Sequence, residues 1–161
     1  MERTLGDSQR GVGESTVSSL MGAPPEWFMR GLLPLVARLA ISAEFVIGAL
    51  GKALGWSGQA QYMASQGLTI IVPLLSAALV IEAVGSLCLI TGFWARSAAA
   101  IMFVYLGIVS VRLHGFWHMT GMVAGANQTH FFKNLGMMGG LLMITVYGAG
   151  RWAVGRSSSS A

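Results

Sequence analysis

Charged side chains are scarce in this sequence. They make up 10% of its 161 residues, whereas 54% of the residues are hydrophobic. A soluble domain carries about 25% charged residues, because its surface has to be wetted. The mean hydropathy is +0.65. The composition therefore excludes an ordinary cytosolic enzyme domain and a disordered chain, and it predicts a single-domain integral membrane protein.

Cysteine is almost absent, and clustered basic residues are absent altogether. Cys88 is the single cysteine, so the chain forms no internal disulfide and no CxxC redox pair. The net charge of +4 comes from ten bases that are scattered singly, which is unlike the basic patches of nucleic-acid-binding proteins. No phosphate loop, nucleotide fingerprint or CxxCH haem site is present. We therefore expect no covalently bound cofactor, no nucleic-acid partner and no catalytic residue of the chain's own.

Four stretches are apolar enough to be membrane spans. A spanning helix needs about 20 mostly apolar residues to cross ~30 Å of hydrocarbon. The candidate spans cover about residues 34–54, 70–92, 97–113 and 131–150. The first of them is the least clean, because it contains both Arg38 and Glu44.

The distribution of bases predicts the orientation. With both termini in the cytoplasm, seven bases lie inside and three lie outside: Arg3, Arg10, Arg30, Arg38, Arg96, Arg151 and Arg156 against Lys52, Arg112 and Lys133. We therefore predict an all-α membrane protein, an antiparallel bundle of four transmembrane helices with both termini cytoplasmic. Residues 30–152 are expected to form this membrane domain. Residues 1–29 are predicted to be a disordered cytoplasmic tail and residues 153–161 a flexible tail.

Two acidic residues lie inside predicted spans. Glu44 and Glu82 are expected at nearly equal depth, roughly 12–14 Å from the outer face at 1.5 Å per residue. A buried charge in a membrane needs a partner, a water molecule or a lost proton. Two facing carboxyls would share a proton and would bind a proton, a cation or a quinone oxygen. The alternative is a structural hydrogen bond that joins two helices.

All three histidines lie in or next to the segment 114–130. His114 and His118 have the i,i+4 spacing that places two imidazoles on one helix face, as metal sites require. His130 and Asn134 share a face if the last helix starts early. Ordinary interfacial polar residues are the favoured interpretation, a quinone or substrate site comes second, and a metal site is the weakest of the three.

Small residues recur at a spacing of four. Gly136 and Gly140 form one such pair, and Gly51 and Gly55 form another. This spacing permits close contact between helices, either within the bundle or between protomers of a homo-oligomer.

Several of these positions together resemble the DoxX family of small four-helix bacterial membrane proteins. The resemblance starts at Arg38 and runs through the Gly48…Gly51-Lys52 end of the first span. It continues with Glu82-x-x-Gly85-x-Leu87 and Gly92-x-x-x-Arg96, and it ends with HFFKNLGMMGG at 130–140 and with Gly148-x-Gly150-Arg151. It covers roughly residues 34–152.

The resemblance implies a role in redox metabolism. The family takes its name from membrane subunits of a thiosulfate:quinone oxidoreductase, and other members are linked to complexes with a sulfurtransferase and a superoxide dismutase. By similarity, the chain is expected to be a membrane subunit that docks a soluble oxidoreductase and offers it the quinone pool. The candidate quinone or proton site residues within the resemblance are Arg38, Lys52, Glu82, His130, Lys133 and Asn134. Glu44 is a further candidate from its place inside the first span, and not from the resemblance. Two alternatives remain open, namely a small proton-coupled carrier and a structural assembly protein.

Overall fold

Short glycine-containing or polar breaks divide the chain into helices. The structure, a computed structural model, describes residues 24–154, and these residues form no strand. The elements in order are a π-helical turn η1 (Phe28–Leu32), α2 (Leu33–Leu54), α3 (Trp56–Ser65), α4 (Ile71–Thr91), α5 (Ala95–Leu113) and α6 (Gly121–Tyr147). The predicted all-helical class is therefore confirmed for the described residues.

Three of these helices are long and apolar enough to cross a membrane. They are Phe28–Leu54, Ile71–Thr91 and Ala95–Leu113, which confirms three of the predicted spans within a few residues. The fourth predicted span lies in α6, a longer helix of 27 residues. Asn127, His130 and Lys133 make its N-terminal half more polar than the other three helices.

The helix ends differ from the predicted ones at three places. α6 begins at Gly121, ten residues before the predicted start, and the polar Asn127 in this added part finds a partner in His114, directly after α5. α3 lies between the first two predicted spans, where no helix was predicted. Helical structure already starts at Glu26, within the segment predicted to be a tail, and the rest of that tail, residues 1–23, lies outside the described residues. Val154 is fixed by a hydrogen bond to Thr91, whereas residues 155–161 of the second predicted tail are not described.

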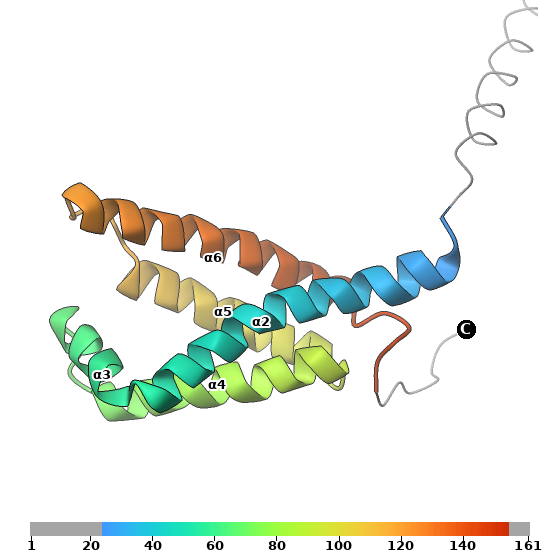
Figure 1. The fold of residues 1–161 in the computed structure, drawn as a ribbon, viewed down its shortest axis with the longest axis horizontal. Helices are drawn as coiled ribbons and strands as arrows, with labels where there is room; N and C mark the ends of the chain where they lie inside the picture. The colour runs from blue at the N-terminus through green and yellow to red at the C-terminus, as the bar shows by residue number, and fades with distance from the viewer. Residues whose placement is uncertain (1–23, 155–161) are drawn as a thin grey trace, which may run out of the picture.

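The long helices lie side by side. α2 packs along α4, α5 packs along α6, and α4 contacts α5. Figure 1 shows that the N-terminal end of α2, the turn between α4 and α5 and the C-terminal end of α6 lie at one end of the molecule. We call this the arginine end, because Arg30 lies in η1 directly before α2, Arg96 lies in the first turn of α5 and Arg151 follows the end of α6. α3 and the connection between α5 and α6 lie at the opposite end.

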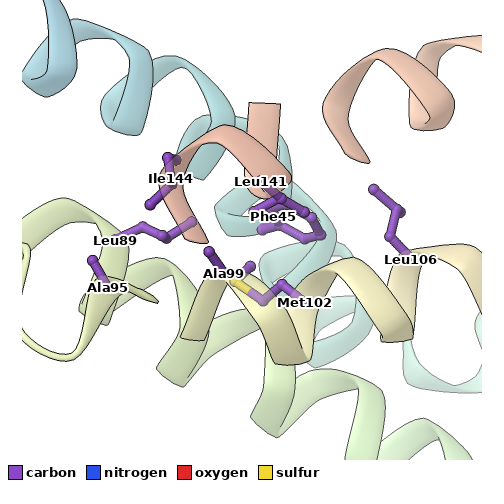
Figure 2. Close-up of a cluster of buried hydrophobic side chains, with 8 residues drawn as sticks. All are labelled: Phe45, Leu89, Ala95, Ala99, Met102, Leu106, Leu141 and Ile144. Atoms are coloured by element: carbon purple, nitrogen blue, oxygen red, sulfur yellow. The ribbon is translucent and has the colours of Figure 1, made fainter. Parts of the chain in front are cut away.

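A small apolar core joins the helices. Figure 2 shows eight buried side chains from α2, α4, α5 and α6 around Met102 and Leu141, both of which are 0% exposed. The outward surface is also apolar, since Leu54 is 87% exposed and Leu87 is 61% exposed. Arg38 and Glu82, by contrast, are 0% and 6% exposed. Apolar residues outside and charged residues inside are typical of helices surrounded by lipid.

The turn between α4 and α5 has only three residues. Gly92 ends α4 with a φ of +80°, a left-handed conformation that glycine adopts without strain. Trp94 precedes α5 in the same region, with a φ of +50°. This conformation costs a residue with a Cβ about 1–2 kcal/mol, so the packing around the turn has to hold it.

Candidate functional site

The best-developed polar site is centred on the carboxylate of Glu82. The Nζ of Lys52 lies 2.8 Å from both of its oxygens, and the hydroxyl of Tyr105 donates to Oε1 at 2.6 Å. Lys52 comes from α2, Glu82 from α4 and Tyr105 from α5, so the site joins three helices. We call these three residues the Glu82 site.

A glycine on α2 makes room for the carboxylate. A Cβ at Gly48 would lie 2.8 Å from Oε2 of Glu82, which is closer than real Cβ contacts. Gly48 and Lys52 are four residues apart, so they share one helix face. α2 therefore offers the carboxylate a space at Gly48 and a cation one turn further on. With any side chain at position 48, either the carboxylate of Glu82 or helix α2 would have to move.

The Glu82 site is an acceptor between two donors in an apolar setting. An ammonium and a carboxylate attract one another strongly where water is scarce. Oε1 accepts from Lys52 and Tyr105, and Oε2 accepts from Lys52, so both oxygens are satisfied. A carboxyl, an ammonium and a phenol are side-chain types that serve in general acid–base chemistry.

Sequence reasoning selected Lys52 and Glu82 but missed Tyr105. Tyr105 was detectable as a tyrosine in the middle of an apolar predicted span. A buried tyrosine hydroxyl usually has a hydrogen-bond partner.

Glu44 belongs to a second, separate ion pair. It accepts a hydrogen bond from Lys133, which ties α2 to α6. Both side chains are about 40% exposed, at 43% and 40%, against 7% for Glu82. Each acid thus has a lysine partner of its own, and no hydrogen bond joins Glu44 to Glu82 within residues 24–154. The predicted sharing of one proton between two facing carboxyls does not fit this arrangement.

Lys52 and Lys133 were both predicted to be quinone or proton site residues. In the structure each lysine binds a glutamate instead.

The histidines group differently from the expectation. The residues after His114 up to Thr120 are not helical, so His114 and His118 do not share a helix face and the weak metal hypothesis loses its geometry. The ring of His114 stacks on that of His130, with centroids 5.0 Å apart. The Nδ1 of His114 also lies 3.1 Å from Oδ1 of Asn127. Burial lowers the pKa of His114, and the charges of His130 and Lys133 act in the same direction.

Asn134 is buried and hydrogen-bonds to α5. Its Nδ2 donates to the Oγ of Ser110 at 3.1 Å, and Ser110 in turn donates to the carbonyl of Leu106. Asn134 and His130 both lie in α6, as an early start of that helix requires. Asn134 contacts Ser110 and His130 contacts His114, so both residues join α6 to α5, and neither hydrogen-bonds to the Glu82 site.

Arg38 lies far from the Glu82 site, fourteen residues or about 21 Å along α2 from Lys52. Its NH1 donates to the carbonyls of Leu89 and Ile90 at the end of α4, at 2.8 and 3.1 Å. Its NH2 donates to the carbonyl of Trp152, beyond α6.

The last carbonyls of α4 are thereby satisfied. The last four carbonyls of a helix lack partners inside the helix. Here the N–H of Gly92 donates to the carbonyl of Cys88, and Arg38 donates to the carbonyls of the next two residues along α4. The N–H of Val154 donates to the carbonyl of Thr91 at 2.8 Å. The geometry makes Arg38 a cap that joins α2, α4 and the chain after α6.

The segment Gly148–Val154, which we call the C-terminal strap, is also held by α2. Pro34 has no N–H, so it leaves the carbonyl of Arg30 without its usual helical donor. Arg151 N–H donates to that carbonyl at 2.6 Å. Gly150 passes so close to Pro34 that a Cβ at position 150 would lie 2.6 Å from the ring.

Of the glycines at a spacing of four, one permits a close helix contact within the chain. Gly140 faces α2, where a Cβ would lie 2.6 Å from Ile41, so this glycine permits a close approach within the chain. Gly136 and Gly51 have no neighbour within 4 Å of a Cβ position among the described residues.

Comparison with known proteins gives the family. The DoxX family model matches residues 33–115, about half of the chain. The inner membrane protein YphA of Escherichia coli (strain K12) is 34% identical over 129 residues, which cover 79% of this chain and 91% of YphA. The chain belongs to the DoxX family. A second relative, the inner membrane protein YqjF of the same organism, is 28% identical over 76% of this chain and 88% of its own length.

These DoxX relatives also support the location. Both Escherichia coli proteins are inner membrane proteins, and this chain has three candidate spans, so it is a multi-pass inner membrane protein. A shorter likeness links 47% of the chain, at 27% identity, to the ER-derived vesicles protein ERV29 of Saccharomyces cerevisiae, of which it covers 24%. No solved structure matches. The family match ends before α6, so the motifs at 130–140 and 148–151 lie outside it.

Proposed function

We propose that this DoxX protein is the membrane subunit of a quinone-linked oxidoreductase complex, built as an antiparallel bundle in which α2, α4, α5 and α6 all cross the membrane and both chain ends are cytoplasmic. The length of α6, about 40 Å at 1.5 Å per residue, supports a fourth crossing. The arginines at the arginine end support a cytoplasmic position for that end.

One observation carries the redox part of the proposal, namely a buried carboxylate held between an ammonium and a phenol. A quinone head group carries two oxygens. They accept hydrogen bonds in the oxidised ring, take up protons when the ring is reduced and release them when it is oxidised again. Lys52 has N–H donors of the kind that such oxygens need, and Glu82 has the acceptor, while the single O–H of Tyr105 stays on Glu82. The chemistry of these three residues therefore fits a quinone.

These residue types give each group a separate role in the proposed reaction. The quinone supplies the electron-accepting chemistry, and electrons come from a soluble oxidoreductase that docks on the chain. Lys52 orients the carboxyl of Glu82 and balances its charge. Tyr105 holds the second lone pair of Oε1, and Glu82 takes up or releases a proton at its carboxyl. The surrounding apolar helices exclude water from this exchange.

A paired substitution tests the role of Glu82. Glu82→Gln keeps the size of the side chain and removes its ability to accept a proton. Glu44→Gln is the matched control, because Glu44 is the other membrane acid and has its own lysine. The chain is purified with its soluble partner in mild detergent, and quinone-dependent turnover is measured. We expect Glu82→Gln to lower turnover about 100-fold while the complex stays assembled, and Glu44→Gln to leave turnover nearly unchanged. Normal turnover in Glu82→Gln, or the absence of any co-purifying oxidoreductase, would contradict the proposal.

The carboxylate of Glu82 has all its hydrogen-bond donors within the chain, which supports a second candidate function, that of a structural assembly protein. Both carboxylate oxygens already have donors within the chain, as in a bond whose purpose is to hold α2, α4 and α5 together. In that case Glu82→Gln lowers the thermal stability and the yield of the complex. Turnover per assembled complex then stays at the wild-type value, which separates the two functions in one experiment.

A further inference from the structure

The arginine end carries an excess of positive charge at the surface. Arg30 and Arg151 share one acid, Glu26, at 4.0 and 3.7 Å, and the three side chains are 51–71% exposed. Two guanidinium groups thus face one carboxylate. Arg96 is exposed as well, and within residues 24–154 no carboxylate lies within 4.0 Å of it.

The positions of Arg96 and Arg151 are fixed by the fold. The guanidinium of Arg96 lies against the backbone of Gly148, where a Cβ would be 3.0 Å from Nε. Arg151 is held by its own backbone bond to Arg30 within the C-terminal strap, and the strap is anchored by Arg38. The first turn of α5 and the strap therefore present their arginines on an ordered surface.

Exposed aromatic rings accompany these arginines. Trp27, Phe93, Trp94 and Trp152 are 47–73% exposed, and Phe93 and Trp94 stack with centroids 5.6 Å apart. Trp and Tyr rings concentrate at the level of the lipid headgroups. α4 ends and α5 begins at this same place, so the arginines lie where two spans leave the hydrocarbon.

We propose that the arginine end binds anionic phospholipid headgroups, with the lipid phosphates contacting Arg96 and Arg151. The excess of guanidinium over carboxylate provides the charge complementarity. The exposed rings place the patch at headgroup depth, which favours a lipid over an anion free in solution. Each arginine near an anionic membrane surface contributes to such binding, and the contribution falls off within a Debye length. This binding is independent of the quinone proposal, because the Glu82 site lies elsewhere on the helices.

The test uses the full chain in nanodiscs of phosphatidylcholine, with or without phosphatidylglycerol. Arg96→Gln and Arg151→Gln each remove one patch arginine. Arg112→Gln is the matched control, because Arg112 lies in the last turn of the same helix whose first turn holds Arg96. Phosphatidylglycerol retained by the purified protein is counted by native mass spectrometry, and the thermal midpoint is measured in both lipids.

We expect phosphatidylglycerol to raise the midpoint of the wild type and of Arg112→Gln by about 2–4 °C. Retained phosphatidylglycerol should fall about fivefold for each patch arginine removed, and Arg96→Lys, which keeps the charge, should restore most of it. Equal retention of both lipids by the wild type would overturn the proposal, and so would an equal loss in Arg112→Gln. Stabilisation of the same size by inorganic phosphate in detergent would also overturn it, in favour of a general anion site. Size-exclusion profiles and helix content check that each variant is folded.

Discussion

Lys52 holds its Nζ 2.8 Å from both carboxylate oxygens of Glu82, although thirty residues separate the two along the chain. The pair is buried among apolar helices, with 17% of the lysine side chain and 7% of the glutamate side chain exposed. Tyr105 adds a third helix through Oε1. One carboxylate thereby sets the relative positions of α2, α4 and α5, whatever further chemistry it performs.

The first prediction concerns the strength of this pair. Lys52→Met leaves a carboxylate in a dry site, and breaking a buried pair from one side costs about 3–5 kcal/mol. Adding Glu82→Gln removes the uncompensated charge, so the double variant should be more stable than Lys52→Met alone. Unfolding in mixed micelles measures the free energies for the full double-mutant cycle.

The half-exposed pair of Lys133 and Glu44 is the control for that cycle. Lys133→Met should cost less than ~1 kcal/mol, since exposed pairs contribute little. Equal costs for the two lysine variants would mean that burial does not distinguish the pairs.

The second prediction concerns the space at Gly48. Gly48→Ala places a methyl group 2.8 Å from Oε2 of Glu82, and the carboxylate or the helix has to move. We expect a loss of about 1–3 kcal/mol in the free energy of unfolding, together with reduced turnover if the Glu82 site is functional.

Gly51→Ala, one turn further along α2, is the matched variant. No atom lies within 4 Å of its Cβ position, so alanine should be neutral or stabilise the helix by up to ~1 kcal/mol. If Gly48→Ala is as stable as Gly51→Ala, the close approach to Glu82 is not a constraint.

The third prediction concerns the C-terminal strap. Arg38→Met removes three hydrogen bonds, two from the end of α4 and one from Trp152. A hydrogen bond to a charged group contributes about 1.5–3 kcal/mol, so the strap should open at least tenfold more often. Trypsin cleavage after Arg151, followed by mass spectrometry under native conditions, measures this opening.

Arg38→Lys provides a graded comparison for the strap. Lysine keeps the charge but lacks the planar fork that reaches several carbonyls at once. Cleavage should therefore be intermediate. Cleavage at the wild-type rate in Arg38→Met would show that Arg38 does not hold the strap.

Parts of the fold could be predicted from the sequence because lipid imposes a simple rule. Spans 70–92 and 97–113 were located within two residues, since unbroken apolar runs and the Gly92 stop are local signals. The start of α6 was missed, because Asn127 looks like a loop residue until His114, directly after α5, supplies its partner. Such partners depend on tertiary packing, which local composition does not reveal.

Of the candidate site, too, one part could be predicted from the sequence and another part could not. A charge within an apolar run is visible in the sequence, so Glu82, Lys52 and Arg38 were selected. Which acid pairs with which base depends on helix rotation, and periodicity alone does not determine it. Arg38 was therefore grouped with Lys52, although the two lie about 21 Å apart along α2. Its role as the cap of α4 depends on the strap, more than one hundred residues later.

The last prediction concerns pH and the junction between α5 and α6. Burial lowers the pKa of His114 below its ordinary value of 6.5, and His130 and Lys133 on α6 add to this effect, while the hydrogen bond to Asn127 opposes it. A histidine with a lowered pKa takes up a proton more readily in the unfolded chain. Its contribution to stability is therefore complete above pH 6.5 and is lost as the pH falls below that value.

We therefore expect the thermal midpoint of the purified protein to fall between pH 7 and pH 5, and His114→Gln to remove part of that fall. His118→Gln is the control, because His118 lies exposed in the same connection. It should keep the wild-type pH dependence. Unchanged pH dependence in His114→Gln would mean that the stacked pair of His114 and His130 does not control the stability of this junction, and the protonation of another group would then have to explain any acid sensitivity.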